Sequence, residues 1–120
     1  MTIGEISKKT NLTESTLRYY EKKKLIQVSR DAKGRREYME NDIEWIKFIC
    51  RLKETGMLLK DIQHYSELRY AGSSTMTERL GMLQSHRQYV LEQQKKWNEY
   101  LRNLDNKILF YEKSILETIL

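Results

Sequence analysis

The stretch from Thr16 to Ile26, TLRYYEKKKLI, decides how this chain is interpreted. Arg18, Tyr19 and Lys22 can all point outward from one helix. Two neighbouring tyrosines beside an arginine are poor core material, because each phenol needs a hydrogen-bond partner and the guanidinium needs a counter-charge. On an exposed helix the same side chains suit a polyanion, since they can neutralise or hydrogen-bond to phosphates. The alternative is an amphipathic surface helix with a solvated lysine run.

The positive charge of the chain is concentrated in its first third. The 120 residues carry 22 Lys and Arg against 17 Asp and Glu, a net charge of +5. Residues 1–38 hold 10 basic and 5 acidic residues and so account for the whole excess, while residues 39–120 hold 12 of each. A basic segment joined to a neutral remainder is typical of a nucleic-acid-binding module.

The composition favours a small core joined to a long exposed helix. Hydrophobic residues make up 39% and charged residues 32%, and the chain has no proline and only five glycines. We find no apolar run long enough to span a membrane and no signal-peptide pattern, so we expect a cytoplasmic protein without a membrane partner. The single cysteine, Cys50, excludes an internal disulfide framework.

Two short helices are signalled at the amino-terminal end. Thr2 and Glu5 predict a capping box for the first helix, which should end at Thr10 and Asn11. Thr13 predicts the start of a second helix after a turn of about four residues, and this arrangement is a helix-turn-helix. In such a motif the second helix enters the major groove with its amino-terminal residues toward the base edges. The predicted DNA-binding residues of this helix are Thr13, Ser15, Thr16, Arg18, Tyr19 and Lys22.

A two-stranded wing is predicted to follow. Two β-capable pieces, residues 26–28 and 36–38, flank the sequence Asp31-Ala32-Lys33-Gly34, where glycine can supply the positive φ of a hairpin turn. Four cations on a small hairpin repel one another, so a phosphate backbone is the expected counter-charge. A solvated loop is the alternative. The four predicted DNA-binding cations of the wing are Arg30, Lys33, Arg35 and Arg36.

Two further helices and a linker complete the predicted head. Asn41 with Glu44 predicts the start of a third helix, which should run to about Thr55. Gly56 is a natural stop, and a fourth helix should span residues 59–70. We therefore predict a DNA-binding domain over residues 1–70, a linker at 71–74 and a coiled-coil helix with a short tail over 75–120.

The last third of the chain carries a heptad repeat. After a capping box predicted for Thr75 and Glu78, the repeat advances in alternate steps of four and three residues. It is fully apolar from Trp97 to Ile115, and Arg87 and Gln94 interrupt it earlier. A helix from Thr75 to about Tyr111 would be roughly 55 Å long, too long to bury its apolar stripe on a 70-residue domain. The simplest partner is a second copy; a helix folded back on its own domain would need a turn for which there is no signal. The predicted dimerisation residues are Leu83, Val90, Trp97, Leu101, Leu104, Ile108 and Tyr111.

The chain resembles the MerR family of transcriptional regulators. The motifs that carry the resemblance are Thr16-Leu17-Arg18-Tyr19-Tyr20-Glu21, Gly34-Arg35-Arg36-Glu37-Tyr38 and the long terminal helix. The resemblance as a whole covers nearly the whole chain. The resemblance implies a mainly α fold, with a winged helix-turn-helix, a small two-stranded β wing and a long C-terminal dimerisation helix in an antiparallel coiled coil. It also implies a sequence-specific DNA-binding transcriptional regulator that as a dimer binds and distorts promoter DNA for RNA polymerase.

By position, the resemblance implies that Tyr38 contacts DNA from the wing together with Arg36. Two residues after the second helix depart from the family pattern. Lys24 stands where the family usually has glycine, and Val28 stands where it often has proline. Metal-sensing members use paired cysteines near the end of the dimer helix, which this chain lacks, so no metal is expected.

Cys50 is open to two interpretations. One branch of the family responds to aldehydes or other electrophiles through a lone cysteine in the third helix, and nearby Lys47, Arg51 and Lys53 would favour the thiolate. Buried cysteine is otherwise an inert small hydrophobe, and Cys50 lies on or beside the apolar stripe of its helix.

Other classes of function are open to test. An architectural or excision-type DNA-binding protein also uses a winged helix-turn-helix but has no promoter role. A coiled-coil assembly protein with an incidental basic head would not bind duplex DNA in a salt-dependent way. An enzyme is disfavoured and no cofactor is expected, because the sequence has no nucleophile–base pair, metal cluster or phosphate loop.

Overall fold

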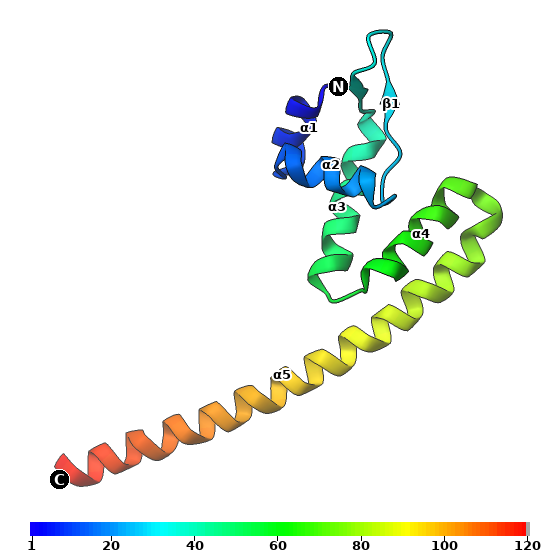
Figure 1. The fold of residues 1–120 in the computed structure, drawn as a ribbon. Coiled ribbons are helices and arrows are strands. Elements are labelled where there is room, and N and C mark those ends of the chain that lie inside the picture. The colour runs from blue at the N-terminus through cyan, green and yellow to red at the C-terminus, as the bar shows by residue number, and fades with distance from the viewer. Residues whose placement is uncertain (120) are drawn as a thin grey trace. The chain divides into compact units, whose positions relative to one another are not determined.

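The computed structural model describes residues 1–119, which fold mainly into helices (Figure 1). The chain splits into two compact units, with the second beginning at Leu83. The elements are α1 (Ile3–Thr10), α2 (Glu14–Lys22), β1 (Ser29–Arg30), β2 (Arg36–Glu37), α3 (Glu40–Glu54), α4 (Leu59–Ala71), the short 3-10 helix η1 (Ser73–Thr75) and α5 (Met76–Ile119). The predicted mainly α fold with a two-stranded wing and a long terminal helix is confirmed.

The helix-turn-helix forms where its caps predict it. The Thr2 hydroxyl accepts a hydrogen bond from the Glu5 backbone N–H at 3.1 Å, and the Glu5 carboxylate accepts one from the Thr2 N–H at 3.3 Å. Asn11 ends α1 with a φ of +58°. The Thr13 hydroxyl then accepts the Thr16 N–H at 3.1 Å and caps α2. Local side-chain chemistry therefore sets both ends of the turn that aims α2.

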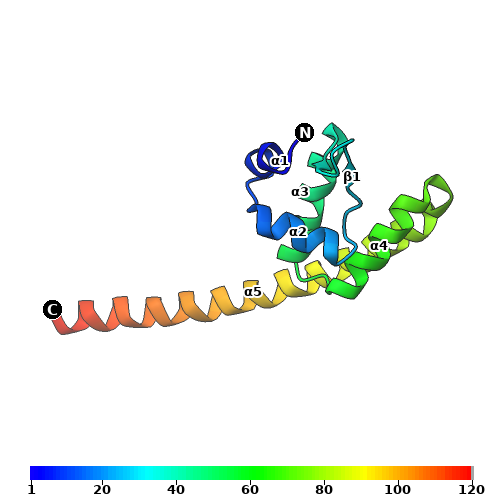
Figure 2. The ribbon, with the colours of Figure 1, turned by 45° about the horizontal axis from the view of Figure 1, so that its top comes forward.

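The core of the first unit gathers side chains from α1 to α4, which lie together in both ribbon views (Figure 1, Figure 2). Leu17, Tyr20 and Leu25 are buried there. The Trp45 ring stacks on Tyr65 with ring centroids 5.8 Å apart. The other buried apolar residues are Ile6, Ile26, Tyr38, Ile46, Ile49, Leu52 and Ile62.

The wing is shorter than the sequence predicts. Its ladder pairs Ser29 with Glu37 and Arg30 with Arg36, so residues 26–28 are not a strand. Ile26 is instead buried in the core, so it cannot form part of a solvent-exposed hairpin. The turn itself forms as predicted, with Gly34 at a φ of +79°.

The Asp31 carboxylate organises that turn. One of its oxygens accepts the backbone N–H groups of Lys33 and Arg35, each at 2.9 Å. The backbone hydrogen bond from Arg35 contributes most to lowering the pKa of the Asp31 carboxyl below its usual value. The wing tip is therefore held by its own aspartate.

Two predicted helix starts are wrong. Helix α3 begins at Glu40, where the Asp42 carboxylate accepts the Met39 N–H at 2.7 Å, so Asn41 and Glu44 do not cap it. Thr75 lies in η1 and its hydroxyl donates to the Gly72 carbonyl at 2.8 Å, so it does not cap α5 with Glu78. At α3 the Asp42 carboxylate provides the cap in place of Asn41 and Glu44, and at η1 a backbone carbonyl accepts the Thr75 hydroxyl.

The predicted stop at Gly56 is confirmed. Gly56 has a φ of +92°, and the Met57 N–H donates to the Leu52 carbonyl at 2.9 Å, which closes the last turn of α3. The predicted linker at 71–74 contains the end of α4, Gly72 at a φ of +105° and the start of η1. Its role as a domain boundary stays a prediction, and Leu120 at the end of the predicted tail lies outside the described residues.

Lys24 leaves α2 in the left-handed region, at a φ of +61°. The Leu25 N–H donates to the Tyr20 carbonyl at 2.9 Å and the Lys24 N–H to the Glu21 carbonyl at 3.0 Å, a pattern that requires this conformation. A residue with a Cβ is strained there by roughly 1–2 kcal/mol. We expect Lys24→Gly to raise the free energy of unfolding by about 1 kcal/mol, since the relieved strain exceeds the additional chain entropy that glycine loses. Urea denaturation measures this change.

The matched control is Lys22→Gly, which removes the same charge from the last turn of α2. Glycine inside a helix should lower the free energy of unfolding by about 1 kcal/mol. Equal changes in the two variants would contradict the assignment of strain to Lys24.

Candidate nucleic-acid interface

The outer face of α2 presents the predicted recognition residues to solvent. Thr13, Ser15, Arg18, Tyr19 and Lys22 are exposed. Tyr19 also has the Lys23 ammonium over its ring, 5.8 Å from the ring centroid. The exposed face therefore combines cations with a phenol, the chemistry expected of a phosphate-binding surface.

Thr16 is the exception on this helix. Its side chain is half-buried and its hydroxyl lies 2.9 Å from the Thr13 hydroxyl. The two threonines share the capping of α2, so the Thr16 hydroxyl already has a partner within the protein. Contact of Thr16 with DNA stays a prediction.

Glu21 of α2 binds two arginines of the wing. Its carboxylate lies 3.1 Å from the Arg30 Nη2 and 2.8 Å from the Arg36 Nε. The Arg35 Nε lies 3.2 Å from the Asp31 carboxylate. Carboxylates of the protein therefore already pair with these three arginines, so mutual repulsion alone does not require phosphate as their counter-charge, and their contact with DNA stays a prediction. Within the described residues no ion pair is recorded for Lys33, which is exposed.

Tyr38 is a correction to the predicted site. Its side chain is 1% exposed, and its hydroxyl has no hydrogen-bond partner among the residues that the structure describes. Burial raises the pKa of this hydroxyl. Side chains alternate along a strand, so Tyr38 points to the core after the exposed Glu37. The structure contradicts a DNA contact through the Tyr38 side chain.

Cys50 sits beside the core on α3. It is half-buried, and its Sγ lies 3.6 Å from the Tyr20 hydroxyl. Burial and then this hydrogen bond raise the pKa of Tyr20, and the Lys53 ammonium lies 5.1 Å from the Tyr20 ring centroid. The geometry agrees with a packing role, and a sensor role for Cys50 stays a prediction.

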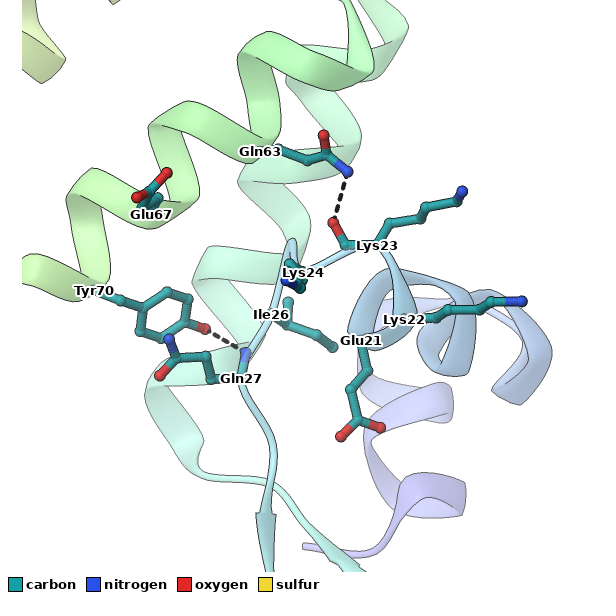
Figure 3. A pocket seen from close by; sticks show the side chains of 9 residues that line it. All are labelled: Glu21, Lys22, Lys23, Lys24, Ile26, Gln27, Gln63, Glu67 and Tyr70. Carbon is teal, nitrogen blue, oxygen red and sulfur yellow. Dashed lines mark hydrogen bonds between the residues drawn. The ribbon is translucent and has the colours of Figure 1, made fainter.

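A groove of about 790 Å³ lies between the exit of α2 and one face of α4 (Figure 3). Lys22 and Lys23 point away from α4, and the Glu21 carboxylate turns away from both lysines. Three residues of the groove that sequence reasoning missed, Gln63, Glu67 and Tyr70, come from α4. The sequence signal for them was a row of polar residues at helical spacing, which cannot be told apart from an ordinary solvent-exposed helix face.

Glu21 restrains two cations that DNA could otherwise use, which leads to a prediction. We expect Glu21→Gln to raise affinity for random-sequence duplex about three- to tenfold at low salt, because Arg30 and Arg36 lose their carboxylate partner. The same change should lower the preference for a specific site, because the wing is no longer fixed to α2. Fluorescence anisotropy with both kinds of duplex measures the two affinities.

Glu37→Gln is the matched control, since it removes the same charge from an exposed position on β2. No ion pair is recorded for Glu37 within the described part of the chain. An equal rise in random-duplex affinity for both variants would reduce the effect to net charge and contradict a specific role for Glu21.

Helix α5 carries the predicted dimerisation stripe. Leu83 and Val90 are half-buried, whereas Trp97 is 69% exposed. The rest of the predicted set is exposed as well: Leu101, Leu104, Ile108 and Tyr111. A row of large apolar side chains open to water is unusual for a monomer and marks an interaction surface.

The described residues contain neither a membrane-spanning helix nor a cluster of metal ligands. None of the described helices combines the length and apolar character of a membrane span. Over the same residues, no group of three or more His, Cys, Asp and Glu side chains is placed to hold a metal ion.

Comparison with known proteins points to one family. Residues 1–68 match the model that describes MerR helix-turn-helix family regulatory proteins. An uncharacterised helix-turn-helix-type transcriptional regulator of Haemophilus influenzae is 34% identical over 114 residues, which cover 94% of this chain and 84% of the relative.

Two solved structures are similar over most of their length. HiNmlR, a MerR family regulator lacking the sensor domain and bound to promoter DNA, has a TM-score of 0.83 and 34% identity, covering 93% of this chain and 90% of that chain. A MerR family transcriptional regulator from Listeria monocytogenes has a TM-score of 0.88 and 29% identity, covering 93% and 86%.

Proposed function

Because the chain belongs to the MerR family of helix-turn-helix regulatory proteins, we propose that it acts as a homodimer that binds promoter DNA and distorts it. The chain is a DNA-binding transcriptional regulator and not an enzyme. The proposal covers the homodimeric assembly, the distortion of promoter DNA, the residues that contact DNA and the protein partner. RNA polymerase is the proposed partner that uses the distorted promoter, and the cytoplasm is the proposed location.

The exposed stripe of α5 is the observation that carries this proposal. A 44-residue helix is about 66 Å long, and its apolar positions from Trp97 to Ile115 are open to water. A lone exposed helix of this kind is marginal, and a second copy is the simplest way to bury a heptad stripe. Two heads joined in this way would each bind half of one operator.

The proposed DNA surface combines α2 and the wing. From α2, phosphates would meet the exposed cations Arg18 and Lys22, with Tyr19 beside them. From the wing, Lys33 is available directly, while Arg30 and Arg36 would share their charge between Glu21 and phosphate. Distortion of the duplex is costly, and paired heads supply the many phosphate contacts needed to offset it.

The test begins with selection of duplexes from a random-sequence library by the full chain. We expect the selected sites to contain two inverted half-sites, and sedimentation to find two chains on each duplex. Energy transfer between dyes on the duplex ends should rise on binding, as expected for a bent site. One chain bound to one half-site, or an unchanged transfer efficiency, would overturn the proposal. Equal bending of every sequence would instead indicate the architectural alternative.

A further inference from the structure

One face of α4 lies along the segment that joins α2 to the wing. Gln63, Ser66 and Tyr70 are spaced by three and four residues, so they share a single face of the helix. Each forms a hydrogen bond with the backbone of residues 23–27. Their partners are Lys23, Leu25 and Gln27, alternate residues of the segment that leaves α2.

Three hydrogen bonds form this contact, which we call the α4 ladder; the first and third are drawn in Figure 3. All three use backbone groups of the segment, so they depend on its path rather than on its side chains. They join Gln63 Nε2 to the Lys23 carbonyl at 2.8 Å, the Ser66 hydroxyl to the Leu25 carbonyl at 2.6 Å, and the Gln27 N–H to the Tyr70 hydroxyl at 3.0 Å.

The middle of the ladder is sealed from water. Ser66 and Leu25 are fully buried, and the Trp45 Nε1 donates to the same Leu25 carbonyl at 3.1 Å. Lys24, one position earlier, holds the left-handed turn that directs the chain onto α4. The segment then enters β1 at Ser29. The path of the segment is therefore fixed where it leaves α2 and where it enters β1, the two elements that are proposed to face DNA.

We propose that Gln63, Ser66 and Tyr70 are positioning residues that set the angle between α2 and the wing, and with it the preference for one operator over other duplexes. The inference rests on the proposed docking of both elements on one site. The three side chains are uncharged and already hydrogen-bond to the segment, so they add no charge to the attraction for phosphate. Their effect therefore separates specificity from overall affinity, which charge substitutions cannot do.

The double variant Gln63→Met, Tyr70→Phe tests the ladder and leaves the buried Ser66 in place. We expect its affinity for the selected operator to fall about tenfold, with random-duplex affinity within about twofold of the wild type and the same salt slope. The Gln27 amide should exchange with solvent at least tenfold faster, because its acceptor is gone. Binding and exchange are measured on the full chain well below its melting temperature.

Tyr65→Phe is the matched control. Tyr65 lies on the same helix and its ring stacks on Trp45, but no hydrogen bond is recorded for its hydroxyl within the described residues. It should keep the operator preference and the Gln27 exchange rate of the wild type. If the tyrosines only stabilised the fold, Tyr65→Phe and the double variant would change the melting temperature alike.

The failure of this inference differs from the failure of the proposed function. A wild-type chain that prefers no duplex over random sequence would overturn the proposed function before any variant is made. With a wild-type preference in hand, a double variant that keeps the operator-to-random ratio would overturn the role of the ladder. So would an unchanged exchange rate at Gln27, because the segment would then be held by something else.

Discussion

Replacing Leu104 and Ile108 with glutamate should turn the protein into a monomer and remove its tight binding to the operator. Both side chains are more than half exposed on α5 and lie in the heptad stripe. In a paired helix they would be buried against the second copy, where four added carboxylates per dimer would be desolvated and would repel one another. The expected mass in sedimentation is that of one 14.5 kDa chain.

The loss of DNA affinity follows from the loss of pairing. When one head is bound, its tether holds the second head at a high effective concentration near the other half-site, a gain of about 10²–10⁴-fold. A monomer loses this gain although every DNA-facing residue is intact. Operator affinity should fall by that factor, while binding to an isolated half-site should change little. The helical signal should also fall, because an unpaired α5 is only marginally stable.

The control places the same charges on another face of α5. Asn103→Glu with Asn106→Glu adds two carboxylates at exposed positions outside the stripe. This variant should stay dimeric and keep its operator affinity within about threefold, the range expected for added surface charge. A Leu104→Glu, Ile108→Glu chain that still sediments as a dimer would show that another surface pairs the protomers.

The sequence predicts the parts of this fold that depend on neighbours along the chain. The caps at Thr2 and Thr13, the stop at Gly56 and the turn at Gly34 are local matters of backbone conformation and one nearby side chain. The heptad repeat of α5 is local in the same sense. Each of these features is readable because the residue and its effect lie within about four positions of each other.

The features that the sequence missed depend on residues far apart in the chain. Glu21 meets Arg36 across 15 positions, and Tyr70 meets Gln27 across 43. Nothing in the local pattern distinguishes Glu21 from a solvated acid, or Tyr38 from an exposed wing residue. Only packing of the hairpin on the core buries Tyr38 and gives the wing arginines a carboxylate. Most of the residues predicted to bind DNA from α2 are exposed, and their contact with DNA stays a prediction, while the sequence did not show the carboxylates that restrain the wing.

Replacing Arg18 with alanine should weaken binding to every duplex by about 100-fold or more. Arg18 is exposed on α2, and no ion pair within the described residues competes for its guanidinium. A charge-assisted hydrogen bond to phosphate contributes roughly 1.5 kcal/mol, and a dimer loses two, which corresponds to about 3 kcal/mol or two decades in affinity. The slope of log affinity against log salt should become shallower by about two, one phosphate per head.

Lys8→Ala is the control, because Lys8 is an exposed cation in the last turn of α1 and is outside the predicted interface. It removes the same charge per chain, so it reports the long-range part of the attraction alone. That part is screened within about 8 Å at physiological salt, and the expected loss is less than about threefold. If Arg18→Ala and Lys8→Ala weaken binding equally and leave the salt slope the same, α2 does not lie against the phosphate backbone. If Arg18→Ala acts only on the selected operator, the guanidinium reads a base edge instead.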